Sequence, residues 1–84
     1  MHYVYILRSE PNPRRTCTGS TSDLRKRLAG HSSGANDHTA RFRPWALVWH
    51  CAFPAKEPAE AFETYLKHGS GHAFAKRHLL QGDT

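Results

Sequence analysis

A chain of 84 residues, of which 38% are hydrophobic, has room for one domain with one small core. No apolar run approaches the ~20 residues that a membrane-spanning helix needs, and no signal-peptide pattern opens the chain. The two cysteines, Cys17 and Cys51, are far apart and form no C-x-x-C pair, which excludes a disulfide framework. We therefore expect a cytoplasmic protein that has no membrane contact.

The net charge of +5 is concentrated in one part of the chain. Residues 44–84 hold four cations and four anions, and Arg8 offsets Glu10 near the start. Residues 14–43 contain only two aspartates beside seven cations, which are Arg14, Arg15, Arg25, Lys26, Arg27, Arg41 and Arg43. This surplus favours a polyanionic partner, and nucleic acid is the simplest candidate.

The first part of the chain predicts a β-hairpin and then a helix. Residues 3–7 (Tyr-Val-Tyr-Ile-Leu) are apolar without strict alternation, which is typical of a central strand buried on both faces. Residues 9–13 contain two prolines and an asparagine and predict a turn. A second strand is expected at residues 14–18, followed by a glycine turn at Gly19 and a helix at about residues 22–30.

This first helix has two distinct faces. Ser22 is a suitable N-cap, because its hydroxyl can accept a hydrogen bond from a free amide of the first turn. Leu24 and Leu28 lie four residues apart and are expected to face a core, whereas Arg27 and His31 share a polar stripe. A cation and an imidazole just after a glycine turn suit a phosphate, although an ordinary amphipathic helix with a basic outer side has the same spacing.

The next segment predicts a loop and a third strand. Residues 31–43 show no periodicity and predict the loop. Residues 45–53 alternate and end at a proline, as a strand does. In this pattern Leu47, Trp49 and Cys51 fall on one face of the strand.

Two helices complete the predicted order. The first begins near Glu57, where the following proline suits a helix start, and ends at Gly69. Its expected inner stripe is Phe62, Tyr65 and Leu66. The second covers about residues 72–81, with Ser70 as its cap. The order ββαβαα predicts an α+β domain with a three-stranded, mainly antiparallel sheet flanked by helices, over residues 1–80, followed by a short tail at 81–84.

Five short motifs occur in the order of one enzyme family. The chain has Tyr3-Val4-Tyr5 where that family has G-I-Y, and Cys17-Thr18-Gly19 where it has Y-I-G. The helix after Gly19, the segment R-P-W-A-L-V at residues 43–48 and the segment F-E-T-Y-L-K around Glu63 follow in register. From Tyr3 to about Leu80 the chain resembles the small stand-alone members of the GIY-YIG nuclease superfamily.

The resemblance implies hydrolysis of phosphodiester bonds in DNA with one divalent cation, Mg²⁺ or Mn²⁺. Glu63 would hold the metal, since a hard carboxylate suits Mg²⁺. Arg27 would pair with the scissile phosphate through two hydrogen bonds. Tyr5 would position or deprotonate the attacking water, with help from His31. Cys17 would complete the catalytic set in the position of the second tyrosine.

The implied substrate is DNA, chosen by structure rather than by sequence, as in DNA repair; RNA as a substrate and the oligomeric state stay open. Contacts to phosphate are expected to dominate. Six residues are candidate substrate contacts, namely Gly19, Ser20, Arg25, Lys26, Arg41 and Arg43.

Each catalytic candidate can also be explained by an ordinary structural role, without a nuclease site. Tyr5 is a typical strand aromatic, and Glu63 a typical solvated helix residue. Arg27 fits a surface cation, and His31 fits the negative end of a helix dipole. Only their joint occurrence in register favours a nuclease site.

Cys17 departs from the family pattern. A thiol is shorter than a phenol and a poorer hydrogen-bond donor, so it leaves two readings open: an active endonuclease, or a nucleic-acid-binding module with weakened catalysis. A thiolate could act as a base but prefers soft metals.

A third reading, a metal-binding protein, is suggested by seven histidines. The pair His68 and His72 has helical spacing, but Gly69 and Gly71 interrupt it, and no pair has the spacing of a zinc finger.

Overall fold

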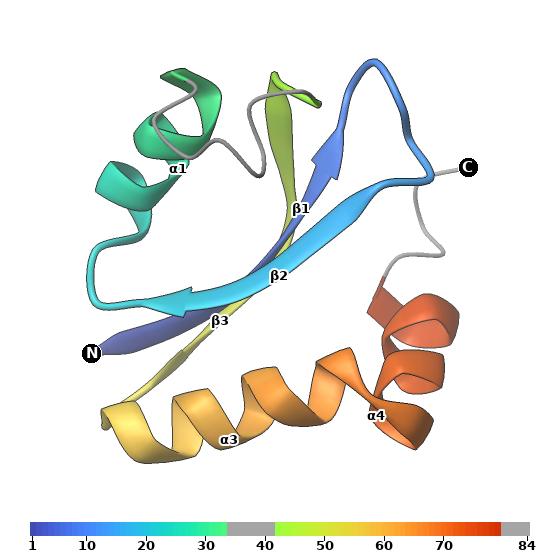
Figure 1. The fold of residues 1–84 in the computed structure, drawn as a ribbon. Helices are drawn as coiled ribbons and strands as arrows, with labels where there is room; N and C mark the ends of the chain where they lie inside the picture. Colours follow the sequence, from blue (N-terminus) through green and yellow to red (C-terminus); the bar gives the residue numbers. More distant parts are fainter. Residues whose placement is uncertain (34–41, 80–84) are drawn as a thin grey trace.

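Helices cover both faces of a three-stranded sheet (Figure 1). The computed structural model describes residues 1–33 and 42–79, and only the backbone at residues 31–33. The elements are β1 (His2–Ser9), β2 (Thr16–Thr21), α1 (Leu24–Ser33), β3 (Trp45–Phe53), α3 (Lys56–Lys67), α4 (Gly69–Phe74) and the π-helical turn η1 (Ala75–Leu79). Helix α1 lies on one face of the sheet, and α3 with α4 on the other. The predicted α+β class and element order are confirmed.

Strand β1 is the centre of the sheet and of the core. The strand order is β2-β1-β3, and both pairings are antiparallel. Residues 4–7 are at most 1% exposed, because they are covered by a strand on each side and by helices on both faces. The prediction of a central strand buried on both faces is therefore confirmed.

Alternation along β1 divides the core into two clusters. Val4 and Ile6 face α3 and pack with residues of α3 and η1, which are Ala59, Leu66, Ala75, Phe62 and Leu79. Tyr5 and Leu7 face α1 and pack with Trp45 and, at the rim, with Leu24 and Leu28. The two leucines of the first helix thus face a core as predicted.

A bulge in β3 changes the predicted alternation. Ile6 lies opposite Trp49, but the next residue, Leu7, lies opposite Leu47, so that Val48 is an extra residue in the ladder. Leu47 consequently points to the other face from Trp49 and is 37% exposed. The prediction that Leu47 lies on the same face of the strand as Trp49 and Cys51 was wrong, because it assumed a regular strand.

Strand β2 begins two residues later and ends three residues later than predicted, so it includes the glycine expected to form a turn. Gly19 lies inside the strand, directly opposite Tyr5. Helix α1 then begins at Leu24, and its cap is Asp23, whose Oδ1 accepts a hydrogen bond from the Lys26 amide at 3.0 Å. Ser22 is not the cap.

The junction of α3 and α4 depends on two glycines. Gly69 has a φ of 53°, a left-handed conformation that suits glycine and ends α3 near the predicted position. A Cβ at Gly71 would overlap the carbonyl oxygen of Tyr65, so Gly71 lets α4 pack directly on α3. Helix α4 therefore starts at Gly69 rather than near residue 72, and Ser70 lies inside it instead of capping it.

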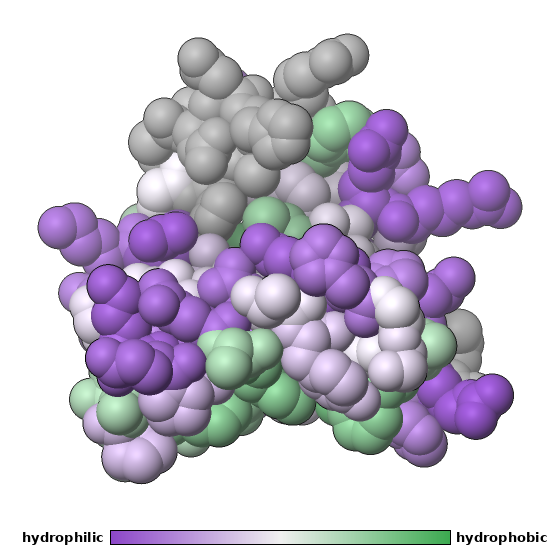
Figure 2. Space-filling model, turned by 60° about the horizontal axis from the view of Figure 1, so that its bottom comes forward, coloured by the Kyte–Doolittle hydropathy of each residue, from purple (hydrophilic) through white to green (hydrophobic). Residues whose placement is uncertain are grey.

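The outer side of α3 is partly aromatic. Tyr65, predicted to face inward, is 44% exposed, and Ala59 is fully buried in the inner stripe. Tyr65 stacks on Phe62 and contacts Phe74, which is itself 39% exposed. Figure 2, in which the α3 side comes forward, shows hydrophobic surface beside polar residues. Within residues 1–33 and 42–79, no helix is both long and apolar enough to cross a membrane.

Candidate active site

Tyr5 extends from the central strand across the backbone of the edge strand β2. Tyr5 and Gly19 are directly opposite each other, so both positions face α1. A Cβ at Gly19 would overlap the hydroxyl oxygen and the ring of Tyr5. The absent side chain at Gly19 therefore makes room for the tyrosine, and Gly19, predicted as a substrate contact, lies buried beneath it.

Arg27 on α1 donates a hydrogen bond to the Tyr5 hydroxyl. Burial raises the pKa of Tyr5 above its ordinary value, and the charge and hydrogen bond of Arg27 offset only part of this effect. Tyr5 is therefore a protonated phenol at neutral pH. Arg27 is itself exposed, so its guanidinium remains accessible to a phosphate.

Glu63 reaches the same strand from the other face of the sheet. Ser20 lies opposite Val4, on the α3 side, and its hydroxyl donates a hydrogen bond of 2.6 Å to Glu63 Oε1. The Lys67 ammonium lies 2.8 Å from Glu63 Oε2, one helical turn further along α3. Burial alone would raise the pKa of Glu63, but hydrogen bonds from Lys67 and Ser20, with the charges of Lys67 and Arg27, lower it. Glu63 is thus an ionised carboxylate.

Glu63 and the pair of Tyr5 and Arg27 come together around strand β2. Glu63 interacts electrostatically with both Tyr5 and Arg27, although they are on opposite sides of the sheet. This is possible because β2 is the edge strand, so a side chain from either helix layer can reach past it. The site therefore straddles β2, with Tyr5 and Arg27 on the α1 side and Ser20 and Glu63 on the α3 side.

Cys17 is half-buried on β2, and its pKa is affected by charged residues of both helix layers, Arg27 on α1 and Glu63 and Lys67 on α3. Burial raises the pKa of its thiol above the ordinary value, and this outweighs the opposing effects of Lys67 and Arg27. The thiol is therefore protonated at neutral pH. It offers a weak hydrogen-bond donor where the family pattern has a phenol, and it does not act as a thiolate base.

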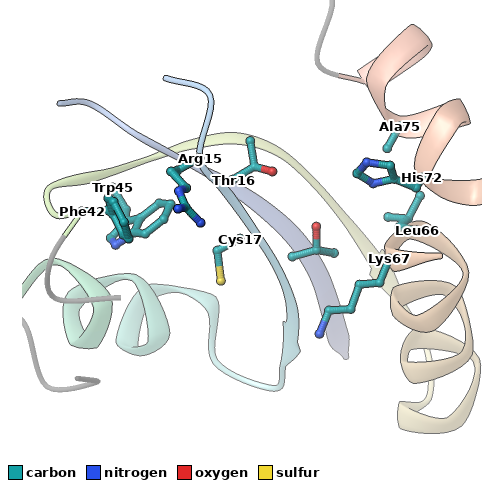
Figure 3. A pocket seen from close by; sticks show the side chains of 10 residues that line it. Arg15, Thr16, Cys17, Phe42, Trp45, Leu66, Lys67, His72 and Ala75 are labelled. Carbon is teal, nitrogen blue, oxygen red and sulfur yellow. The ribbon is translucent and has the colours of Figure 1, made fainter. Parts of the chain in front are cut away.

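A hollow of about 340 Å³ adjoins the site. Figure 3 shows Arg15 and Cys17 on one side of it, and Lys67 and His72 on the other. Phe42 and Trp45 form a further part of its lining, and the Arg15 guanidinium stacks over the Phe42 ring at 4.8 Å from the centroid. Of the catalytic candidates, Cys17 lines this hollow, and so does Lys67, the ion-pair partner of Glu63.

The structure separates the other predicted substrate contacts from this hollow. Arg25 and Lys26 are exposed on α1, and Arg25 lines a different hollow beside Tyr3 and Asp23. Arg43 is exposed at the entry to β3. Arg41 and the side chain of His31 lie outside the described residues. Ser20 is engaged with Glu63.

Lys67 is the main residue that sequence reasoning missed. Its spacing of four residues from Glu63 on a predicted helix indicates an ion pair, and that pattern could have identified it.

Glu63 is the residue of this site that would hold a hard divalent cation. Glu63 supplies an ionised carboxylate at an accessible position, with its side chain 20% exposed. Among the described residues, no group of three or more His, Cys, Asp or Glu side chains could hold a metal. A site with one carboxylate suits Mg²⁺, which keeps several of its waters. To hold such an ion, Glu63 would have to lose its ion pair with Lys67.

Comparison with known proteins decides the family. The sequence model of the GIY-YIG catalytic domain matches residues 1–77. The chain belongs to the GIY-YIG family. Tyr5, Cys17, Gly19, Arg27 and Glu63 all lie inside the matched range.

Two kinds of GIY-YIG relative are similar to this chain. The structure-specific endonuclease subunit SLX1 of Candida dubliniensis is 40% identical over 83 residues, which cover 90% of this chain but only 28% of that protein. The UPF0213 protein BH0048 of Halalkalibacterium halodurans is 43% identical over 68 residues, which cover 80% of this chain and 70% of that protein. The chain thus spans about a quarter of the yeast relative and most of the bacterial one.

A solved GIY-YIG-like structure has the same fold. The solution NMR structure of the UPF0213 protein BH0048 from Bacillus halodurans aligns with 98% of this chain and 86% of that chain, with a TM-score of 0.56 and 37% identity. The three-stranded antiparallel sheet with flanking helices therefore follows the fold of this relative.

Proposed function

We propose that this GIY-YIG domain is a divalent-metal-dependent DNA endonuclease that selects its substrate by DNA structure rather than by base sequence. One observation carries the proposal. Tyr5 and its partner Arg27 lie over Gly19 on one face of the edge strand, and Glu63 accepts a hydrogen bond from the next residue, Ser20, on the other face. A phosphate-binding cation and a metal-binding carboxylate at one place are what phosphodiester hydrolysis needs. The similarity to a structure-specific endonuclease subunit supports the proposal.

Each residue has a separate part in the proposed reaction. Arg27 binds the scissile phosphate through its planar guanidinium and stabilises the negative charge that develops there. Glu63 holds the Mg²⁺ or Mn²⁺, which when bound neutralises charge and activates water. Ser20 holds the Glu63 carboxylate in position through its 2.6 Å hydrogen bond.

Tyr5 positions the attacking water in this proposal. Its hydroxyl accepts a hydrogen bond from Arg27, which leaves its own proton to donate. Because its pKa is raised, a role as hydrogen-bond donor suits it better than a role as base at neutral pH. Tyr5 would therefore orient the attacking water rather than deprotonate it, and the proton of that water would pass to solvent.

The first experiment is a cleavage assay on single-stranded, duplex, flapped and four-way branched DNA with Mg²⁺ or Mn²⁺. Wild type is compared with Glu63→Gln, which keeps the size of the side chain and removes its charge. Cleavage by wild type alone, abolished by a chelator and strongest on branched or flapped DNA, is the expected result. Equal cleavage by both proteins would contradict the role of Glu63.

The variant Cys17→Tyr distinguishes the two hypotheses for this domain, an active endonuclease and a nucleic-acid-binding module with weakened catalysis. We expect this variant to cleave faster than wild type, because Cys17 borders an open hollow and a phenol restores a stronger hydrogen-bond donor. Initial cleavage rates and thermal melting of both proteins provide the measurement. A folded Cys17→Tyr variant that cleaves more slowly would show that the thiol is favourable where it stands.

A further inference from the structure

A second hollow continues the one beside the site. It has a volume of about 540 Å³ and is lined by Arg8, Pro13, Arg14, Thr16, His72 and Lys76. Thr16 and His72 also line the hollow that contains Cys17 and Lys67. The two hollows therefore adjoin each other at Thr16 and His72, and together they make up one hollowed stretch of surface from Cys17 to the turn between β1 and β2. We call it the hairpin channel.

The hairpin channel is strongly basic. Arg14 and Arg15 line it from the hairpin turn, and Lys67 and Lys76 line it from α3 and η1. None of the described residues that line either hollow is acidic. A groove with charges of one sign attracts a polyanion, and its connection to Cys17 places that polyanion next to the catalytic candidates.

The hairpin wall of the channel is fixed by hydrogen bonds. The Arg15 amide donates to the Asn12 carbonyl at 2.9 Å, and the Ser9 amide donates to the Arg15 carbonyl at 3.0 Å. The Ser9 hydroxyl accepts from the Asn12 amide and donates to the Phe42 carbonyl at 2.6 Å, and Ser9 is fully buried. Arg14 and Arg15 are thus carried by an ordered turn, which lowers the entropy lost when they bind a ligand.

The helical wall is fixed as well. Gly71 packs against the backbone of Tyr65 and locks α4 onto α3. The next residue, His72, lines both hollows, and Lys76 follows one turn later. Figure 3 shows Arg15 on the hairpin wall and Lys67 and His72 on the helical wall of the first hollow.

We propose that the hairpin channel binds the sugar–phosphate backbone of the DNA strand that leaves the active site on one side of the scissile bond. Arg14 and Lys76 contact phosphates there, and Lys67 and Arg15 connect this subsite to the reacting phosphate. The position of this subsite relative to a scissile bond rests on the proposed endonuclease function. The binding of DNA in the channel is tested without cleavage.

The test measures DNA affinity with a chelator present, so that no strand is cut. A fluorescein-labelled DNA duplex with a single-stranded arm is titrated with wild type and with Arg14→Gln/Lys76→Gln, by fluorescence anisotropy across a series of potassium chloride concentrations. The double variant is expected to bind about tenfold more weakly, and its plot of log affinity against log salt to be less steep by about 2 units, because two phosphate contacts are lost.

The matched control is Lys56→Gln/Arg77→Gln. It also removes one lysine and one arginine, both exposed and neither lining the channel, and Arg77 is the neighbour of Lys76. Thermal melting checks that both double variants are folded. Equal losses in the two variants would mean that overall charge governs binding, and unchanged binding by Arg14→Gln/Lys76→Gln would remove the channel from the DNA path; either result overturns the proposal.

A second experiment tests whether the channel holds the DNA strand on only one side of the cleavage position. Uncharged methylphosphonate linkages are placed on either side of the cleavage position in the DNA arm. Wild type is expected to bind one of the two substrates more weakly than the other, and Arg14→Gln/Lys76→Gln is expected to bind them equally. If wild type shows no difference between the two sides, the channel does not hold one flank of the strand. Absence of cleavage in the presence of metal would contradict the proposed function alone.

Discussion

Arg27→Ala is expected to slow DNA cleavage by about 10²–10³-fold, the usual effect of removing a charged donor aimed at developing negative charge. Arg27 is exposed on α1, and its loss leaves the two core clusters intact. We therefore expect the free energy of unfolding to fall by about 1 kcal/mol or less, mainly from the lost hydrogen bond to Tyr5. Single-turnover cleavage rates and chemical denaturation of the same preparations measure both effects.

Arg27→Lys is the matched control for charge. The ammonium keeps the positive charge but cannot make the two parallel hydrogen bonds of a guanidinium, so we expect an intermediate rate. Loss of cooperative unfolding in Arg27→Ala would mean that the residue is structural. Full activity of Arg27→Ala would exclude it from contact with the reacting phosphate.

Gly19→Ala is expected to damage stability and activity together. The new Cβ would overlap the hydroxyl and ring of Tyr5, which is only 1% exposed and has little room to move. Overpacking of this kind costs about 1–3 kcal/mol, and displacing the Tyr5 hydroxyl from Arg27 should reduce cleavage by more than about tenfold. Thermal or denaturant unfolding and cleavage assays on the folded protein are the measurements.

Gly30→Ala provides the control, since among the described residues no atom beyond the neighbouring backbone of its own helix lies within 4 Å of a Cβ built there. In the interior of α1 that change should be neutral or stabilising by up to about 1 kcal/mol. The double variant Gly19→Ala/Tyr5→Phe should recover part of the lost stability, because the hydroxyl oxygen is the atom nearest to the new Cβ. If Gly19→Ala is as stable as Gly30→Ala, the close contact with Tyr5 does not constrain the site.

The predictions from sequence were most successful where local pattern determines structure. The apolar, β-forming residues 3–7 fitted a central strand buried on both faces, and Leu24 and Leu28 could be placed by helical spacing. The helix cap is Asp23 rather than the predicted Ser22. Both residues have side chains that suit a cap, so the choice depends on the exact start of the helix, which the sequence does not fix.

The arrangement of the site could not be read from one sequence. The role of Gly19 depends on its pairing opposite Tyr5, and a glycine before a helix reads equally well as a turn. Tyr5 and Glu63 lie on opposite faces of the sheet, and they approach each other because β2 is an edge strand, which is a property of the whole sheet. The bulge at Val48 and the contact between Gly71 and α3 are likewise results of tertiary packing.

The ion pair between Glu63 and Lys67 gives the site an internal counter-ion. Under the proposed function, a divalent ion that takes Glu63 exchanges places with an ammonium group, and the displaced Lys67 stays beside the hollow that it lines. Metal loading then adds the charge of the ion and also frees the Lys67 ammonium, which was paired with Glu63, to contact DNA. Thermodynamic reciprocity requires that bound DNA, by attracting Lys67, strengthens metal binding to the same degree. The pair would make this small domain a weak metal binder by itself and a stronger one on its substrate.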